Sequence, residues 1–206
     1  MRLVLPRLYV ILDASLLTLP EKDYAKKLVD AGVRLIQYRN KQASPRQLLE
    51  TSRELAAFLN PLDVTFIVND RADVAAMTDA AGVHVGQEDL GVEQARLVAG
   101  KGKWVGVSTH NAEQFRRATD TSADYIAVGP VFATGSKMNP DPVVGVEFVR
   151  KMRAASDKPI VAIGGITLER ANEVIEAGAD SVAVISDILQ AADCGLRARA
   201  YLELLR

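Results

Sequence analysis

The sequence predicts an α/β protein, a single (β/α)8 barrel of the TIM type with short loops that spans residues 1–206. Short runs rich in Val and Ile recur without polar alternation, which is typical of parallel strands buried on both faces. Stretches of helical periodicity separate these runs, and eight such pairs follow one another. A doubly wound open sheet would suit six strands better, and no G-x-G-x-x-G motif follows the first strand.

Strands and helices alternate along the whole chain. The predicted strands cover Leu8–Leu12, Arg34–Tyr38, Thr65–Val68, Val83–Val85, Trp104–Val107, Tyr125–Val128, Ile160–Ile163 and Val182–Ile185. The helices that follow them in turn cover Lys22–Ala31, Pro45–Phe58, Arg71–Ala80, Val92–Val98, Ala112–Ala118, Val146–Ala155, Leu168–Ala177 and Ile188–Leu204. Units of about two dozen residues are short for a fold that usually needs roughly 250 residues, so most loops must be minimal.

Capping residues predict where several helices start. Ser44 is an N-cap followed by Pro45 at the first helical position. Asn111 with Gln114 resembles a capping box, and Thr167 is expected to cap the seventh helix.

Glycines predict where helices stop. The pairs Ala31–Gly32, Ala81–Gly82 and Ala177–Gly178 are each expected to end a helix, because glycine adopts the left-handed conformation at little cost. The stretch 129–145 is the longest without apolar periodicity and is rich in Gly, Pro, Asn and Asp, which is typical of a loop that covers a ligand.

Composition limits the classes of function. Hydrophobic residues make up 49% and charged residues 25%, as in ordinary globular proteins. The net charge of -1 favours neither nucleic acid nor a membrane as a partner. Assembly into a homo-oligomer is compatible with this charge. Pro6, Arg7 and Asp13 interrupt the apolar start too early for a signal peptide, so we expect a cytoplasmic location. The lone Cys194 excludes an intrachain disulfide and is expected to pack inside a helix layer.

Polar or glycine-rich residues follow the ends of seven predicted strands. Because active sites of such barrels lie at the carboxyl ends of the strands, these residues form one candidate site. The segments are QYRNK, VND, VGQED, GVST, GPVFATGSK, AIGG and VIS.

Two carboxylates end neighbouring strands of this barrel. Asp70 and Asp89 are hard oxygen ligands, and Mg²⁺ is typically held by one or two carboxylates with substrate phosphate oxygens. The alternative is that each aspartate caps the helix that follows it.

Cations and amides lie at the same strand ends. Arg39, Lys41 and Lys137 form a cationic arc suited to a diphosphate, although a loop Lys or Arg is often only solvated surface. Gln37 and Asn69 could read a heteroaromatic ring, or could bond neighbouring backbone.

The last strands predict a phosphate site. Gly164–Gly165 and Ile185–Ser186 precede helices, which is the usual phosphate position in this barrel, although glycine pairs also serve as tight turns. His84 lies within a strand and is expected to be core or lining. His110 follows the fifth strand near Ser108 and could act as an acid or base.

Taken together, these motifs resemble the thiamine phosphate synthase family. The likeness covers nearly the whole chain in order, and it is specific because seven separate motifs agree. They are Gln37–Lys41, Asn69–Asp70, Gly86–Asp89, Gly106–Ser108, Gly129–Lys137, Gly164–Gly165 and Ile185–Ser186. The family implies a (β/α)8 enzyme that joins a hydroxymethylpyrimidine diphosphate to a thiazole phosphate carboxylate, with release of pyrophosphate and CO₂.

The resemblance also implies roles for individual residues. Asp70 and Asp89 would hold Mg²⁺, and the catalytic residues would be Arg39, Ser108 and Lys137. The pyrimidine diphosphate would contact Gln37, Tyr38, Arg39, Asn40, Lys41, Asn69, Ser108 and Lys137. The thiazole phosphate would contact Thr134, Gly135, Ser136, Gly165, Ile185 and Ser186.

The chain departs from the family pattern at a few positions. Family members more often carry Leu and Glu where Tyr38 and Asn40 stand, and Pro and a second Thr within the segment Ala133–Ser136. The competing interpretations are a thiazole tautomerase, which uses a histidine resembling His110, and a silent barrel that binds a phosphorylated ligand as a regulator. The metal and diphosphate residues argue against both.

Overall fold

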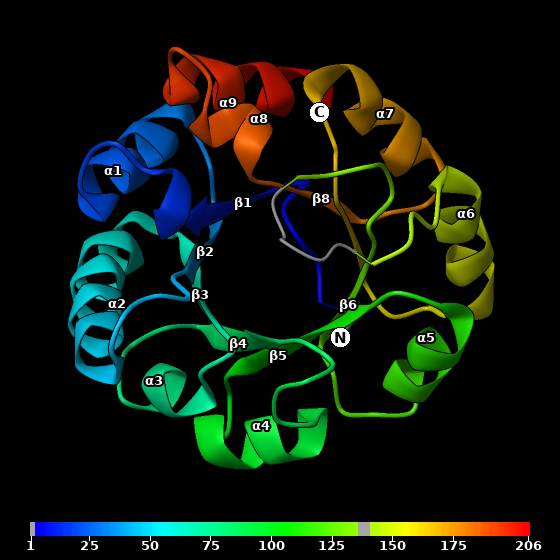
Figure 1. The fold of residues 1–206 in the computed structure, drawn as a ribbon, viewed down its shortest axis with the longest axis horizontal. Helices are drawn as coiled ribbons and strands as arrows, with labels where there is room; N and C mark the ends of the chain where they lie inside the picture. The colour runs from blue at the N-terminus through cyan, green and yellow to red at the C-terminus, as the bar shows by residue number, and fades with distance from the viewer. Residues whose placement is uncertain (1–2, 136–140) are drawn as a thin grey trace.

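The structure is a computed structural model that describes residues 3–135 and 141–206. Its strands close into a parallel barrel in chain order from β1 to β8, and β1 pairs with β8 to complete the ring. The helices lie in sequence around the outside of this barrel (Figure 1). The predicted (β/α)8 fold is therefore confirmed.

The bounds agree with the predicted ones within a few residues for most elements. The strands are β1 (Leu8–Asp13), β2 (Leu35–Arg39), β3 (Thr65–Asn69), β4 (Gly82–Val85), β5 (Trp104–Thr109), β6 (Tyr125–Val128), β7 (Ile160–Ile163) and β8 (Ser181–Val184). The helices are α1 (Glu21–Ala31), α2 (Pro45–Leu59), α3 (Ala72–Ala76), α4 (Val92–Ala99), α5 (Ala112–Thr119), α6 (Val146–Ala155), α7 (Leu168–Glu176), α8 (Ser186–Leu189) and α9 (Cys194–Leu204).

Alternate residues of each strand enter two separate cores. In β1, Tyr9 and Ile11 pack inside the barrel, whereas Val10 and Leu12 pack between strands and helices. The period of two in a strand produces this division. The inward positions continue past the strand ends, so that the last inward residue of each strand faces the barrel mouth.

Several predicted caps are confirmed. Ser44 and Gln47 form a reciprocal capping box at α2. Gly32 and Gly178 have φ values of 108° and 105°, as a left-handed helix end requires. Asn111 accepts bonds from two backbone N–H groups of α5, but the Gln114 side chain bonds the backbone of its neighbour His110 rather than that of Asn111.

The boundary predicted at Thr167 is confirmed, because Thr167 occupies the N-cap position of α7, but its side chain makes no cap bond. Two other predicted boundaries are wrong. Gly82 does not end a helix: it begins β4, where an added Cβ would lie 2.3 Å from the Trp104 carbonyl oxygen. Helix α3 stops early because Thr78 Oγ1 donates to the Val74 carbonyl and accepts from Ala80 N.

The final predicted helix is two helices. Helix α8 ends at Leu189, and α9 starts at Cys194 with the Asp193 side chain accepting from Leu196 N at 3.0 Å. Cys194 is buried, as expected, and burial raises the pKa of its thiol. Among the described residues, no helix has the length and apolarity to cross a membrane.

Candidate active site at the barrel mouth

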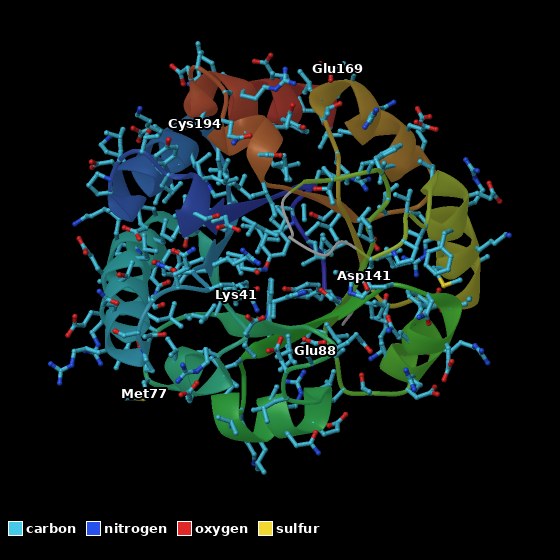
Figure 2. All side chains as sticks on the ribbon, viewed as in Figure 1. Lys41, Met77, Glu88, Asp141, Glu169 and Cys194 are labelled. Carbon is cyan, nitrogen blue, oxygen red and sulfur yellow. The ribbon has the colours of Figure 1, made fainter. Side chains whose placement is uncertain are left out.

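The inward-facing ends of the strands bring the predicted polar residues together. Gln37 and Arg39 come from β2, Asn69 from β3 and Ser108 from β5, and all of them line one cavity of about 100 Å³. Lys41 and Asp141 lie over the central opening of the barrel, whereas Met77 and Cys194 lie in the outer ring (Figure 2). These four predicted residues therefore lie together at the mouth of the barrel.

Asp70 and Asp89 meet at one side of this mouth. Asp70 has a φ of 61°, a left-handed conformation that is uncommon for residues other than glycine, and its carboxylate pairs with the Lys41 ammonium. Asp89 accepts from Gly86 N at 2.7 Å. Burial raises the pKa of Asp89, against the Gly86 hydrogen bond, and the Asp70 carboxylate raises it further.

Neither aspartate caps a helix, so that alternative is wrong. The N-cap of α3 is Arg71 and that of α4 is Gly91, and neither cap position has a side-chain bond. Two like-charged carboxylates in contact at a cavity wall instead form an arrangement that a divalent cation would stabilise. Among the described residues, no cluster of three or more ligating side chains is present.

Arg39 is held by a residue that sequence analysis did not assign. Its Nη1 lies 2.5 Å from Asp13 Oδ2, and Asp13 is buried at the end of β1. The other Asp13 oxygen accepts from Ser15 N at 3.0 Å and from Ser15 Oγ at 2.7 Å. Both carboxylate oxygens of Asp13 therefore accept hydrogen bonds, and Asp13 orients the Arg39 guanidinium at the mouth.

A chain of hydrogen bonds crosses the barrel interior below the mouth. Gln37 Nε2 donates to Tyr9 Oη at 2.7 Å, and Tyr9 Oη lies 3.0 Å from Tyr125 Oη. Tyr125 Oη lies 3.1 Å from His84 Nδ1, and His84 Nε2 lies 2.9 Å from Ser108 Oγ. Burial raises the pKa of both tyrosines, so each hydroxyl stays protonated.

These hydrogen bonds fix the position of the Ser108 side chain. Each hydroxyl and each ring nitrogen of the series can donate or accept, so donation can run in either direction along it. In both directions Ser108 Oγ is held by His84 Nε2 at the wall of the central cavity. His84 is a lining residue, as predicted, and it also orients Ser108.

Tyr38 and Asn40 line a neighbouring cavity of about 670 Å³ rather than the central one. Tyr38 faces the helices, where its hydroxyl donates to Glu21 at 2.9 Å and accepts from Asn40 Nδ2 at 3.1 Å. Asn40 Oδ1 accepts from the backbone of Gln42 and Ala43 and so shapes the loop. Burial raises the pKa of Tyr38 to about 12. The structure therefore separates these two residues from Gln37, whereas Arg39 and Lys41 line both their cavity and the mouth.

His110 joins two segments at the mouth. Its Nδ1 lies 2.6 Å from the Gly129 carbonyl oxygen, and its Nε2 lies 3.4 Å from an Asp141 carboxylate oxygen. The two ring nitrogens thus contact two separate residues of the segment between β6 and α6. His110 also lines the central cavity beside Ser108.

The predicted phosphate residues line a second cavity, of about 580 Å³, on the opposite side of the mouth. Its members include Thr134, Gly135, Gly165, Ile185 and Ser186. An added Cβ at Gly165 would lie 2.4 Å from the Ala133 carbonyl oxygen, so glycine is needed for the loops after β6 and β7 to meet. The predicted residues Ser136 and Lys137 lie outside the described residues.

Three cavities follow one another across the mouth. A cavity of about 560 Å³ lies over Asp70 and Asp89 and shares Arg39 and Ser108 with the central one. The central cavity in turn shares residues with the phosphate-side cavity, among them Ile163, Gly164 and Ile185. The lining therefore forms one groove with a carboxylate end and a glycine-rich end.

Sequence analysis missed several residues that line this groove or support it from below. Asp13 ends the first strand just as Asp70 follows the third, so the strand-end rule could have found it. Tyr9 and Tyr125 gave no signal because they read as ordinary strand residues. Arg170 and Arg197 line the phosphate-side cavity from α7 and α9, and they read as helix surface.

Comparisons with known proteins agree along nearly the whole chain. A family model described as thiamine monophosphate synthase matches residues 8–188. A thiamine-phosphate synthase of Koribacter versatilis is 53% identical over 98% of this chain and 97% of its own, and one of Methanocella arvoryzae is 44% identical over 93% and 91%. A solved thiamine phosphate pyrophosphorylase from Pyrococcus furiosus has a TM-score of 0.88 at 34% identity, covering 97% of this chain and 95% of that one.

Proposed function

Because the chain belongs to the thiamine monophosphate synthase family, it is a transferase of thiamine biosynthesis, and we propose the substrates, the metal and the residues through which it acts. The substrates are 4-amino-2-methyl-5-hydroxymethylpyrimidine diphosphate and a thiazole phosphate carboxylate. The products are thiamine phosphate, pyrophosphate and CO₂.

The two-ended groove is the observation that supports this assignment. A diphosphate with a metal suits the end that holds Asp70, Asp89 and Lys41, and a monophosphate suits the glycine-rich end. The two rings would then meet over the central cavity, which is lined by Ile163, Ile185 and Ser108. Binding two reactants in one groove supplies much of the barrier reduction through proximity.

The carboxylate end fits Mg²⁺. Asp70 and Asp89 offer hard oxygen ligands in direct contact, and the raised pKa of Asp89 reflects in part the like charge beside it. With Asp70 and Asp89 as the protein ligands, the remaining ligands would be water and diphosphate oxygens, as Mg²⁺ prefers. When bound, the cation would stabilise negative charge on the leaving diphosphate.

The side chains around the central cavity would do the remaining work by position and charge. Arg39, oriented by Asp13, would hold the diphosphate with the N–H groups that Asp13 does not use, together with Lys41 and Lys137. Ser108, held by His84 at the wall of the central cavity, would form a hydrogen bond with the pyrimidine ring edge. Gln37 and Asn69 would read the remaining ring edge. Catalysis of this kind needs no nucleophilic residue.

A direct assay tests the proposal. Purified protein with both substrates and Mg²⁺ should form thiamine phosphate, and EDTA should abolish the reaction until Mg²⁺ is restored. Undiminished turnover after complete chelation would exclude the metal, and an unchanged metal requirement in Asp70→Asn with Asp89→Asn would exclude these ligands. A cytoplasmic location and a homo-oligomeric state stay predictions.

A further inference from the structure

Two arginines line the phosphate-side cavity, and their charges are balanced differently. Arg197 donates to both oxygens of Asp187 at 2.9 Å and lies 3.5 Å from Glu169. Arg170, within residues 3–135 and 141–206, forms no ion pair with a carboxylate. Among the cations of this wall that the structure describes, Arg170 is therefore the one without a carboxylate partner.

The Arg170 guanidinium is nevertheless held in place. It lies over the Phe132 ring at 4.7 Å from the ring centroid, and its Nη1 donates to the Gly165 carbonyl at 3.1 Å. An arginine that only extends into solvent would need neither contact. Stacking on an aromatic ring restricts the plane of the guanidinium and leaves its other N–H groups available.

The position of Arg170 in α7 does not stabilise the helix. It lies in the first turn, two residues after the start at Leu168, where the helix dipole disfavours a positive charge. An anion bound in the adjacent cavity would compensate both the dipole and the guanidinium. The cavity, the stacking and the lack of a carboxylate partner in the described part of the chain thus point to the same ligand chemistry.

We propose that Arg170 binds the phosphate group of the substrate that enters this cavity, and that Phe132 positions it for that task. The inference rests on the proposed function, because it takes the thiazole phosphate as the occupant. Arg170 then determines the preference for the phosphorylated thiazole over the same thiazole with a free hydroxyl. Arg197, already neutralised by Asp187, serves the structure of the wall.

Steady-state kinetics with two thiazole substrates test this role. Arg170→Gln keeps a donor for the Gly165 carbonyl but removes the charge, Arg170→Lys keeps the charge, and Arg116→Ala is a control on the exposed face of α5. We expect Arg170→Gln to raise KM for the phosphorylated thiazole by about 10-fold or more, with kcat within about threefold. Arg170→Lys and Phe132→Leu should give smaller increases, and the control none.

The dephosphorylated thiazole separates binding from damage to the fold. The KM for the dephosphorylated thiazole should be the same in wild type and in Arg170→Gln. An equal rise for both thiazoles, or no change for either, would overturn the inference. If the wild type formed no product, the proposed function would fail, and calorimetric titration with inorganic phosphate would still decide on Arg170. Weaker phosphate binding by Arg170→Gln than by wild type would support it, and equal binding would overturn it.

Discussion

Asp13 and Arg39 illustrate how the orientation of a candidate site residue depends on a buried neighbour. The Asp13 carboxylate is buried and accepts from Ser15 as well as from the guanidinium. It therefore sets the direction in which Arg39 presents its remaining donors. Removing the charge of Asp13 would free the guanidinium to rotate while making the mouth more positive.

We expect Asp13→Asn to lower kcat by about 10-fold or more, because a misdirected donor stabilises the leaving diphosphate less well. Affinity for the pyrimidine diphosphate should not fall in parallel, since the site gains net positive charge. Steady-state kinetics measure both values. Ser15→Ala is the matched control, because it removes one bond to Asp13 and leaves the ion pair intact. A parallel loss of affinity, kcat and stability would instead indicate a damaged fold.

His110 distinguishes the synthase from a thiazole tautomerase. Its ring contacts the Gly129 carbonyl and the Asp141 carboxylate, so it positions a loop. A group essential for proton transfer typically supplies about 10²- to 10⁴-fold. We therefore expect His110→Ala to lower coupling by less than about tenfold, whereas Asp70→Ala abolishes it. Thiamine phosphate formation measures both. Metal-independent isomerisation of the thiazole that disappears in His110→Ala, without coupling in wild type, would contradict the assignment.

At the scale of elements, the junction of α8 and α9 shows where periodicity misleads. The apolar pattern continues across Gln190–Asp193, although the chain breaks there and restarts with an Asp193 cap. The two helices are joined by side chains instead. Asp187 of α8 accepts from Arg197 at 2.9 Å and from Tyr201 at 2.6 Å, both of α9. The sequence signal that could have revealed this break is Asp193, because aspartate is a favoured N-cap and it stands immediately before α9.

This junction should make stability depend on pH. Burial acts to raise the pKa of Asp187, but the hydrogen bonds from Arg197 and Tyr201 outweigh it, and the pKa is lowered. A carboxylate whose pKa is lower in the folded state stabilises the fold at pH values above its unfolded-state pKa of about 3.9. This stabilisation is lost as the pH falls through the folded-state pKa. Asp187→Asn should cost about 1–3 kcal/mol at pH 7. Urea unfolding should show this difference shrinking below about pH 4, and a difference independent of pH would contradict it.

For the whole molecule, much of the arrangement was predictable because strand ends of a parallel barrel share one rim. Eight buried apolar runs sufficed for the fold, and Asp70 with Asp89 followed from their places after neighbouring strands. The alternation of side chains could also have separated Tyr38 from Gln37, since adjacent strand residues face opposite ways. Hydrogen bonds across the barrel, such as that between Tyr9 and Tyr125, depend on how far distant strands are shifted along their axes relative to one another. No local sequence pattern predicts that shift.

Close packing inside the barrel gives a prediction at this scale. An added Cβ at Gly106 of β5 would lie 2.1 Å from Tyr125 Cζ, whereas one at Gly135 would meet nothing within 4 Å. Gly106→Ala should lower the free energy of unfolding by about 1–3 kcal/mol through overpacking. Gly135→Ala is the control and should leave it within about 0.5 kcal/mol. Denaturant unfolding compares the two variants, and equal stability would mean that the Tyr125 ring moves aside freely.

The hydrogen-bonded series from Gln37 to Ser108 also constrains how such a barrel can evolve. Replacing any interior member by an apolar residue leaves a buried neighbour without its partner, at a cost of about 1–3 kcal/mol. Replacing several together avoids that orphaned group. Descendants of this chain should therefore keep Tyr9, Tyr125 and His84 as a set or lose them as a set, and variants carrying a single exchange should be rare intermediates under selection.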